Sequence, residues 1–400
     1  MNYFLIELKQ FFLHKKTLTI LLAVCLVAGF LGFSEKNQRP IERIDVSEMT
    51  ARYESRQYFL DHFENTPGTD GGELMLYDWF TQWNPVENER IEAAKNHDWQ
   101  QYAAASARWY RYGLQYTGGQ MVPMPPEYYT FGNLYPAYDF YYHYSYTEAL
   151  MTAFAKEQPT KAALEEKTGL QIFLKVMNGW LPFFLILATT FSLTDLLLKD
   201  RRHRSLVAGY SLSVTRILLA KTAVALCGAV TVFGLALLTI VGVNLDQGIG
   251  SLAYPVPVLC LTADVTRPIV GFENFDIRSI GSLLGQEFLL YMLISLVIIR
   301  LSWLVALWWK QEGLILLLTA GAILAGPLRE RRWYSIVIDR SNDPTLYFGL
   351  GQIVTGYRRF FYGSANFTFF KGCLLFGGIW LVLELILWWW THRRRFQLLA

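Results

Sequence analysis

Long apolar runs alternate with polar stretches along this chain of 400 residues. The first run, TLTILLAVCLVAGFLGF at residues 17–33, contains no charged residue. A helix needs about 20 predominantly apolar residues to cross a bilayer. Five further runs are comparable in length: residues 172–198, 222–243, 283–309, 313–328 and 369–391. The pattern predicts an all-α polytopic membrane protein with six transmembrane helices.

The charges that flank these runs predict their orientation. Three lysines precede the first run, and basic clusters at 199–204 and 393–395 follow the second and the sixth runs. Because cytoplasmic flanks carry an excess of Lys and Arg, we expect both termini in the cytoplasm. The basic cluster at 329–332 falls outside in this topology. Either the fifth helix is re-entrant or a packed outer structure neutralises these arginines.

The residues before the first run have helical spacing. Their apolar positions are Phe4, Leu5, Leu8, Phe11 and Phe12. The spacing predicts an amphipathic elbow helix on the inner leaflet, and the alternative is a frayed end of the first transmembrane helix. A cleaved signal peptide would have a shorter apolar core and a small-residue cleavage site, which this run lacks. We therefore expect an uncleaved anchor.

Residues 34–171 differ in composition from the other parts of the chain. They hold twelve Lys or Arg and twenty Asp or Glu, although only 17% of the whole chain is charged and its net charge is +3. A soluble protein carries about 25% charged residues. The patterns predict helices over 41–63, 87–116 and 145–173, the last interrupted at Pro159. The glycines and prolines of TGGQMVPMPPEYY are expected to end the second of these helices.

The expected organisation is a membrane protein with a large, mostly helical extracellular domain. Residues 1–33 comprise the elbow and the first transmembrane helix, and residues 34–171 form the extracellular domain. Residues 172–400 hold the remaining five transmembrane helices. This last part includes a cytoplasmic segment at 199–221 and outer loops at 244–282 and 329–368.

The extracellular segment is densest in aromatic residues between Tyr128 and Tyr146, where ten of nineteen residues are Tyr or Phe. Amphipathic rings favour places that are apolar at one end and wet at the other. One interpretation is a domain core or a belt against lipid headgroups. The other is a surface that guides an amphipathic substrate or seals the outer mouth. Its candidate residues are Tyr128, Tyr135, Tyr138 and Tyr141.

The chain lacks the sequence features of an ATPase or a metalloenzyme. It has no G-x-x-x-x-G-K-[ST] loop, none of its six histidines lies in the middle of an apolar run, and its four cysteines form no metal-binding pattern. We therefore expect no catalytic residue, no metal and no cofactor bound by this chain.

Three charged residues within the apolar runs stand out. Arg300 and Glu384 are single charges roughly 10–15 Å from the cytoplasmic ends of their helices, at about 1.5 Å per residue. Charges at this depth are costly unless they face protein or a partner, so the two are candidates for a pair. Alternatively, Arg300 snorkels inwards or meets another subunit and Glu384 faces a wet cavity. Glu287 lies near the outer end of the fourth run.

The basic segment at 199–221, KDRRHRSLVAGYSLSVTRILLAK, is charged at its start and then partly apolar. Such a segment can lie along the inner surface as a short helix and present a patch to a soluble partner. The order of residue types along this segment resembles that of the cytoplasmic loop in ABC-2-type ABC transporter permeases. The matching positions are Asp200, Gly209, Arg216 and Lys221. The Gly-Thr pair of that family is replaced here by Arg204 and Ser205, and its turn proline by Ser213.

The resemblance implies that the segment is a coupling helix that docks in a groove of a separate ATPase. The residues implied in coupling are Asp200, Arg202, Arg204, Gly209, Tyr210 and Arg216. The alternative is that these residues only anchor the topology.

The resemblance also implies the function and the partners. The chain would be the permease subunit of an ATP-driven exporter in a bacterial cell membrane, moving an amphipathic peptide, lipid or drug-like molecule out of the cell. The implied partners are two copies of a cytoplasmic ABC ATPase, which supplies ATP and Mg²⁺, and a second copy of this chain or a homologous permease; no nucleic acid is expected. The alternative function is a non-transporting sensor or assembly protein whose extracellular domain binds a ligand.

Overall fold

The computed structural model describes residues 3–117, 136–202, 214–261, 275–308, 312–329 and 339–393, which are mostly helical. The chain divides into two compact units. The first consists of Met1–Asn37, Ile172–Ile249 and Gly281–Ala400, and the second of Gln38–Gln171 and Gly250–Ile280. We call the first the membrane unit and the second the insert unit, because both of its segments are inserted between helices of the first.

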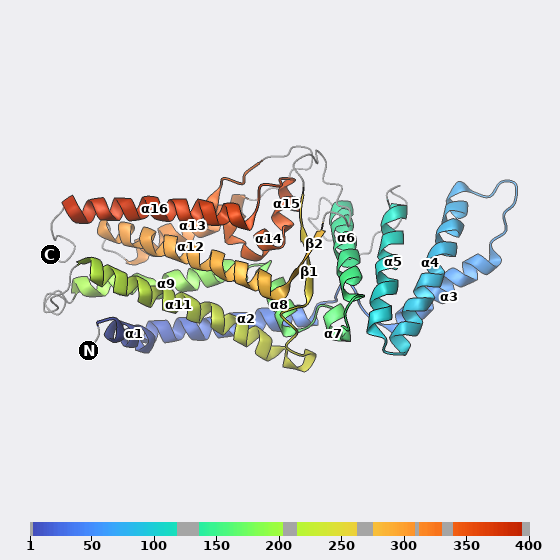
Figure 1. Ribbon diagram of the computed structural model, residues 1–400, viewed down its shortest axis with the longest axis horizontal. Helices are drawn as coiled ribbons and strands as arrows, with labels where there is room; N and C mark the ends of the chain where they lie inside the picture. Colours follow the sequence, from blue (N-terminus) through green and yellow to red (C-terminus); the bar gives the residue numbers. More distant parts are fainter. Residues whose placement is uncertain are drawn as a thin grey trace. The chain divides into compact units, whose positions relative to one another are not determined.

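The membrane unit consists of long helices that run alongside one another (Figure 1). They are α1 (Tyr3–Leu13), α2 (Lys15–Asn37), α9 (Leu181–Arg202), α11 (Val214–Val243), α12 (Ile280–Trp308), α13 (Glu312–Arg329) and α16 (Phe369–Arg393). Among the described residues, four of these, α2, α11, α12 and α16, are long and apolar enough to cross a membrane by length and composition. Four of the six predicted apolar runs therefore form long apolar helices.

The other two predicted runs have a different form. The run at 172–198 is broken between α8 (Gly169–Met177) and α9, where the chain bends by 73°. Pro182 lies in the first turn of α9, and a proline there cannot continue a preceding helix. The run at 313–328 lies in α13, whose strongly apolar part, Leu316–Gly326, is short.

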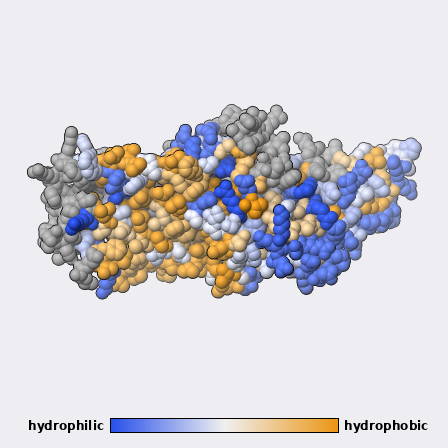
Figure 2. Space-filling model, viewed as in Figure 1, coloured by the Kyte–Doolittle hydropathy of each residue, from blue (hydrophilic) through white to orange (hydrophobic). Residues whose placement is uncertain are grey.

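The surface of the membrane unit is apolar over much of its length (Figure 2). Leu22, Leu26 and Phe30 on α2 and Leu374 and Leu385 on α16 each expose more than half of their area. Soluble proteins rarely expose contiguous apolar surface on this scale. Together with the four apolar helices, this surface indicates a protein embedded in a membrane.

Three short helices follow α13: η4 (Pro344–Phe348), α14 (Leu350–Val354) and α15 (Tyr357–Tyr362). Of these, α14 packs against the break between α8 and α9. The Gln352 side-chain amide donates to the Asn178 carbonyl at 2.7 Å. Gly351 lies so close to the backbone of Met177 and Asn178 that a Cβ atom there would meet it at 2.6–2.7 Å. Part of the segment 329–368, which was expected to be an outer loop, is thus helical, and it contacts the backbone between α8 and α9.

The insert unit is a row of helices completed by a β-hairpin. Its elements are α3 (Val46–His62), α4 (Gly71–Lys95), α5 (Trp99–Thr117), α6 (Pro136–Phe154), α7 (Lys161–Leu164), β1 (Pro255–Leu259) and β2 (Phe275–Ser279). Each helix from α3 to α6 packs on the next, and α6 contacts both strands. The strands are antiparallel, with Pro255 opposite Ser279 and Leu259 opposite Phe275. The hairpin was not predicted, because residues 244–282 were expected to form a loop.

The helix that was predicted over 87–116 is two helices, and that expectation was wrong. Asn96 ends α4, His97 takes a positive φ of 56°, and the Asp98 carboxylate accepts a hydrogen bond from the Gln101 N–H at 2.9 Å. A left-handed residue followed by an acidic cap ends one helix and starts the next. The predicted interruption at Pro159 is present, between α6 and α7. Most of TGGQMVPMPPEYY lies outside the described residues.

Arg90 is buried in the centre of the insert unit, with 3% of its area exposed. Its guanidinium donates to Glu42 at 2.5 Å, to Glu87 at 2.9 Å and to the Ser106 hydroxyl at 2.9 Å. Burial disfavours the charged form of Arg90, but Glu42, Tyr102, Glu87 and Tyr110 together outweigh burial, and the pKa of Arg90 lies well above its ordinary value. Arg90 therefore joins the segment before α3 to α4 and α5.

Replacing Arg90 by Leu is expected to lower the free energy of unfolding of the insert unit by about 3–5 kcal/mol, because two carboxylates would remain buried without a cation. Pulse proteolysis of the purified full chain across a urea series measures this change. Lys95→Ala is the matched control, since the exposed pair of Lys95 with Glu92 is worth at most about 1 kcal/mol. Equal losses in the two variants would contradict the role given to Arg90.

Candidate functional site

Arg300 on α12 and Glu384 on α16 form an ion pair inside the membrane unit. Arg300 Nε lies 2.6 Å from Glu384 Oε2. The guanidinium also donates to the Thr222 hydroxyl on α11 at 3.0 Å, and its carbon lies 4.7 Å from the centre of the Trp303 ring. The pairing that the estimated depths suggested is present in the structure. It joins three apolar helices by polar contacts that lipid cannot replace.

Glu287 is not part of this pair. It lies thirteen residues before Arg300 on the same helix, which is about 20 Å along the axis. Its side chain is fully buried, and neither carboxylate oxygen has a hydrogen-bond partner among the described residues. One turn further along α12, the Tyr291 hydroxyl lies 2.6 Å from the Thr189 hydroxyl of α9. The three charges expected within the membrane thus occupy two separate places.

The ends of the helices that border the basic segment are held together by contacts of two lysines, of which Lys221 is buried and Lys16 half-buried. The ammonium of Lys221, on α11, donates to the Leu196 carbonyl on α9 and lies 3.9 Å from Glu7 on α1. Lys16, at the start of α2, donates to the Thr194 hydroxyl on α9 at 3.0 Å. The base of the segment is therefore built from four helices.

An apolar cluster surrounds these lysines. Phe11 of α1 packs with Leu193 and Leu196 of α9 and with Val224 of α11. The Phe11 ring also fits against Gly228, where a Cβ atom would meet the ring at 2.8 Å. The glycine is required here by the close approach of α1 to α11.

The structure describes only part of the residues that were implied in coupling. Asp200 and Arg202 lie in the last turn of α9, and their side chains are outside the description. Arg216 lies in the first turn of α11 and is exposed. Arg204, Gly209 and Tyr210 lie outside the described residues.

Part of the aromatic stretch contributes to the core of the insert unit. Phe140, Tyr142 and Tyr144 are buried, whereas Tyr141 is half-buried. Of the other residues proposed to guide a substrate, Tyr138 lies on α6 with its side chain outside the description, and Tyr128 and Tyr135 lie outside the described residues.

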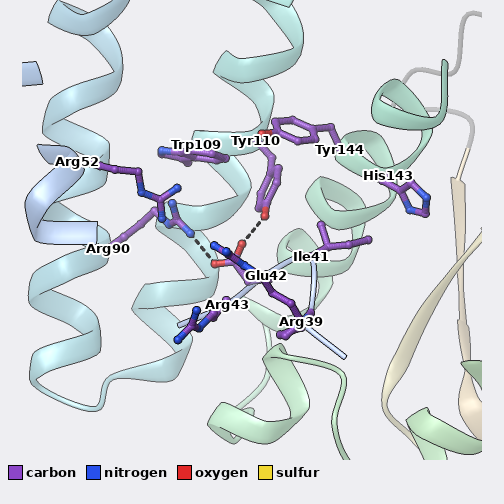
Figure 3. Close-up of a pocket in the computed structure, with 11 residues that line it drawn as sticks. Arg39, Ile41, Glu42, Arg43, Arg52, Arg90, Trp109, Tyr110, His143 and Tyr144 are labelled. Atoms are coloured by element: carbon purple, nitrogen blue, oxygen red, sulfur yellow. Dashed lines mark hydrogen bonds and ion pairs between the residues drawn. The ribbon is translucent and has the colours of Figure 1, made fainter. Parts of the chain in front are cut away.

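The insert unit contains a cavity that the sequence did not predict (Figure 3). Its volume is about 310 Å³. It is lined by residues from the segment before α3 and from α3 to α6: Arg39, Pro40, Ile41, Glu42, Arg43, Arg52, Arg90, Trp109, Tyr110, His143 and Tyr144. The sequence signal was weak. Arg39 and Arg43 stand close together in an acidic segment, but Arg52 and Arg90 join them only through the fold.

Within the part of the chain that the structure describes, no three His, Cys, Asp or Glu side chains are grouped so that they could hold a metal ion. Comparisons of the chain with protein-family models, curated proteins and solved structures give no match.

Replacing Arg300 or Glu384 by Leu is expected to destabilise the membrane unit, by about 3–5 kcal/mol where a buried charge loses its partner. The double replacement leaves no orphan charge, so its loss should be smaller than the sum of the two single losses, by about 1–3 kcal/mol. Thermal unfolding of the detergent-purified single and double variants measures the coupling.

The control for this cycle is the exposed pair of Lys36 and Asp246, whose N–O distance is 2.7 Å. Alanine at both positions should cost at most about 1 kcal/mol. Strictly additive losses at Arg300 and Glu384 would show that the ion pair contributes no coupling energy.

Proposed function

We propose that this chain is the membrane subunit of an ATP-driven exporter of the ABC-2 type. In this proposal the chain crosses a bacterial cell membrane six times, with α2, the broken pair α8–α9, α11, α12, α13 and α16. Helix α1 lies on the inner leaflet as an elbow, both termini are cytoplasmic, and the insert unit is extracellular. The basic clusters at 199–204 and 393–395 then lie on the side where Lys and Arg are favoured.

The observation that carries the proposal is the construction at the base of the basic segment. Lys221 and Lys16 connect α11 and α2 to the end of α9, and α1 packs into the same cluster. A segment that transmits force from a soluble partner needs a rigid base, since otherwise its displacement would be absorbed locally. Contacts among four helices at this point provide such a base. A segment that served only as a topology anchor would need its basic residues but not these contacts among four helices.

The proposed mechanism assigns ATP chemistry to the partner and movement to this chain. Two cytoplasmic ABC ATPase subunits bind ATP and Mg²⁺, and residues 199–216 dock on one of them. Closure of the ATPases displaces the segment, and α9 and α11 follow because Lys221 connects them. A second copy of this chain, or a homologous permease, completes the pathway for an amphipathic peptide, lipid or drug-like molecule.

The cavity in the insert unit favours a second candidate function, a sensor or assembly protein that does not transport. A cavity of about 310 Å³ is within the usual range of small-molecule sites. The two functions differ in their need for ATP. An exporter loses its function when the ATPase is inactivated, whereas a sensor of this kind keeps it.

The triple replacement Arg202→Ala, Arg204→Ala and Tyr210→Ala is expected to uncouple the ATPase. The chain should remain folded, because the three replacements leave Phe11, Leu193, Leu196 and Val224 of the buried cluster unchanged. Its ATPase partner should hydrolyse ATP at the rate that it shows without the chain, and transport should be lost. The measurements are co-purification, ATP turnover in proteoliposomes and thermal stability. A triple variant with unchanged co-purification, turnover and transport would mean that the segment is only an anchor.

A cysteine at Ser55 is expected to react with a membrane-impermeant maleimide added to whole cells, and a cysteine at Ser205 is expected not to react. Ser55 is exposed on α3, so its reactivity reports the side of the membrane rather than burial. The four natural cysteines are first replaced by serine, and labelling after permeabilisation is the control for reactivity at position 205. External labelling at position 205 would reverse the proposed orientation.

A further inference from the structure

The cavity of the insert unit has a charge opposite to that of its surroundings. Residues 34–171 hold twelve basic and twenty acidic residues. Among the described residues that line the cavity, four are arginines and only one, Glu42, is acidic. The acidic character of the segment as a whole suggests a cationic ligand, whereas the lining of its cavity points to an anion.

Glu42 is largely occupied by hydrogen bonds from its neighbours. Its Oε1 atom accepts from Arg90 and from the Tyr102 hydroxyl, and its Oε2 atom accepts from the Tyr110 hydroxyl. The side chain is also buried, with 5% of its area exposed. Figure 3 shows the carboxylate between Arg90 and Tyr110. Arg90 balances this charge, so neither residue is the main determinant of the ligand.

The other three arginines are accessible. About half of each side chain of Arg39, Arg43 and Arg52 is exposed, and each is paired only with an exposed or half-exposed acid, Asp45 or Glu48. A guanidinium has five N–H donors, and these ion pairs use only some of them. Exposed pairs of this kind contribute little energy. An anionic group can therefore take up the remaining donors at small cost.

One side of the cavity is aromatic. The rings of Trp109 and Tyr110 each lie 4.9–6.1 Å from the Tyr144 ring. Figure 3 shows these three rings on one side of Glu42, with Arg39 and Arg43 on the other side. The Trp109 indole N–H is buried and has no hydrogen-bond partner among the described residues. The cavity thus combines an aromatic side with three accessible cations.

We propose that this cavity binds a small aromatic acid, with its anionic group on Arg39, Arg43 and Arg52 and its ring against Trp109 and Tyr144. A planar carboxylate matches the donor geometry of the guanidinium, and aromatic rings pack favourably on one another. A volume of about 310 Å³ accommodates one or two fused rings with their acid group but not a folded peptide. This ligand site does not depend on the proposed export function.

The test is isothermal titration calorimetry on the purified full chain in nanodiscs, without an ATPase. Three aromatic acids, benzoate, indole-3-acetate and 2-naphthoate, are compared with benzylamine, tryptamine and 2-naphthylmethylamine, which carry the same rings on cationic groups. Inorganic phosphate serves as an anion without a ring. At least one acid should bind, its amine should not, phosphate should bind at least about tenfold more weakly, and the affinity should fall with added salt.

The variant Arg39→Gln, Arg43→Gln, Arg52→Gln should weaken binding of the acid by about tenfold or more, because charge-assisted hydrogen bonds are lost. The matched control is Lys95→Gln, Arg108→Gln, Lys156→Gln, which removes the same charge from exposed positions outside the cavity and should bind normally. The proposal is overturned if none of the three acids binds, if amine and acid bind alike, or if the two triple variants behave alike. None of these results bears on ATP-dependent transport.

Discussion

A guanidinium that is removed from water must find its hydrogen-bond partners inside the protein. The insert unit is organised around such a group, the buried guanidinium of Arg90. Arg90 holds Glu42, Glu87 and Ser106 and lies 4.6 Å from the centre of the Trp109 ring. Because Glu42 precedes α3 and Trp109 lies on α5, Arg90 helps the hydroxyls of Tyr102 and Tyr110 to hold the segment that carries Arg39 and Arg43 against the aromatic rings.

The membrane unit obeys the same constraint more strictly, since lipid offers no hydrogen bonds. Arg300 forms an ion pair with Glu384 and donates to Thr222, and Lys221 donates to the Leu196 carbonyl. Each contact joins helices that are distant in sequence. Glu287 is the exception among the charges expected in the membrane, because its buried carboxylate has no partner within the described residues.

The apolar runs were readable from sequence because hydropathy and length alone decide whether a helix suits a bilayer, and the depths of Arg300 and Glu384 followed from the fixed rise of a helix. The break before Pro182 was missed because average hydropathy does not register one proline. The hairpin was missed because β1, PVPVL, contains two prolines, which are unusual in strands. Arg90 was missed because Glu87, three residues before it, makes it resemble an exposed helix pair; its burial depends on Glu42, 48 residues away.

The insert unit is assembled from two segments that are far apart in the chain. The hairpin strand β2 supplies Phe275, which packs on Tyr142 and Tyr146 of α6, and Tyr254 packs on Phe154. A ribosome that has finished residue 171 must add about 110 more residues before residue 280 is available, which takes roughly 5–20 s at ordinary rates of synthesis. During that interval one face of α6 lacks its partner strands. The nascent chain therefore carries an incomplete domain while α9 and α11 are being made.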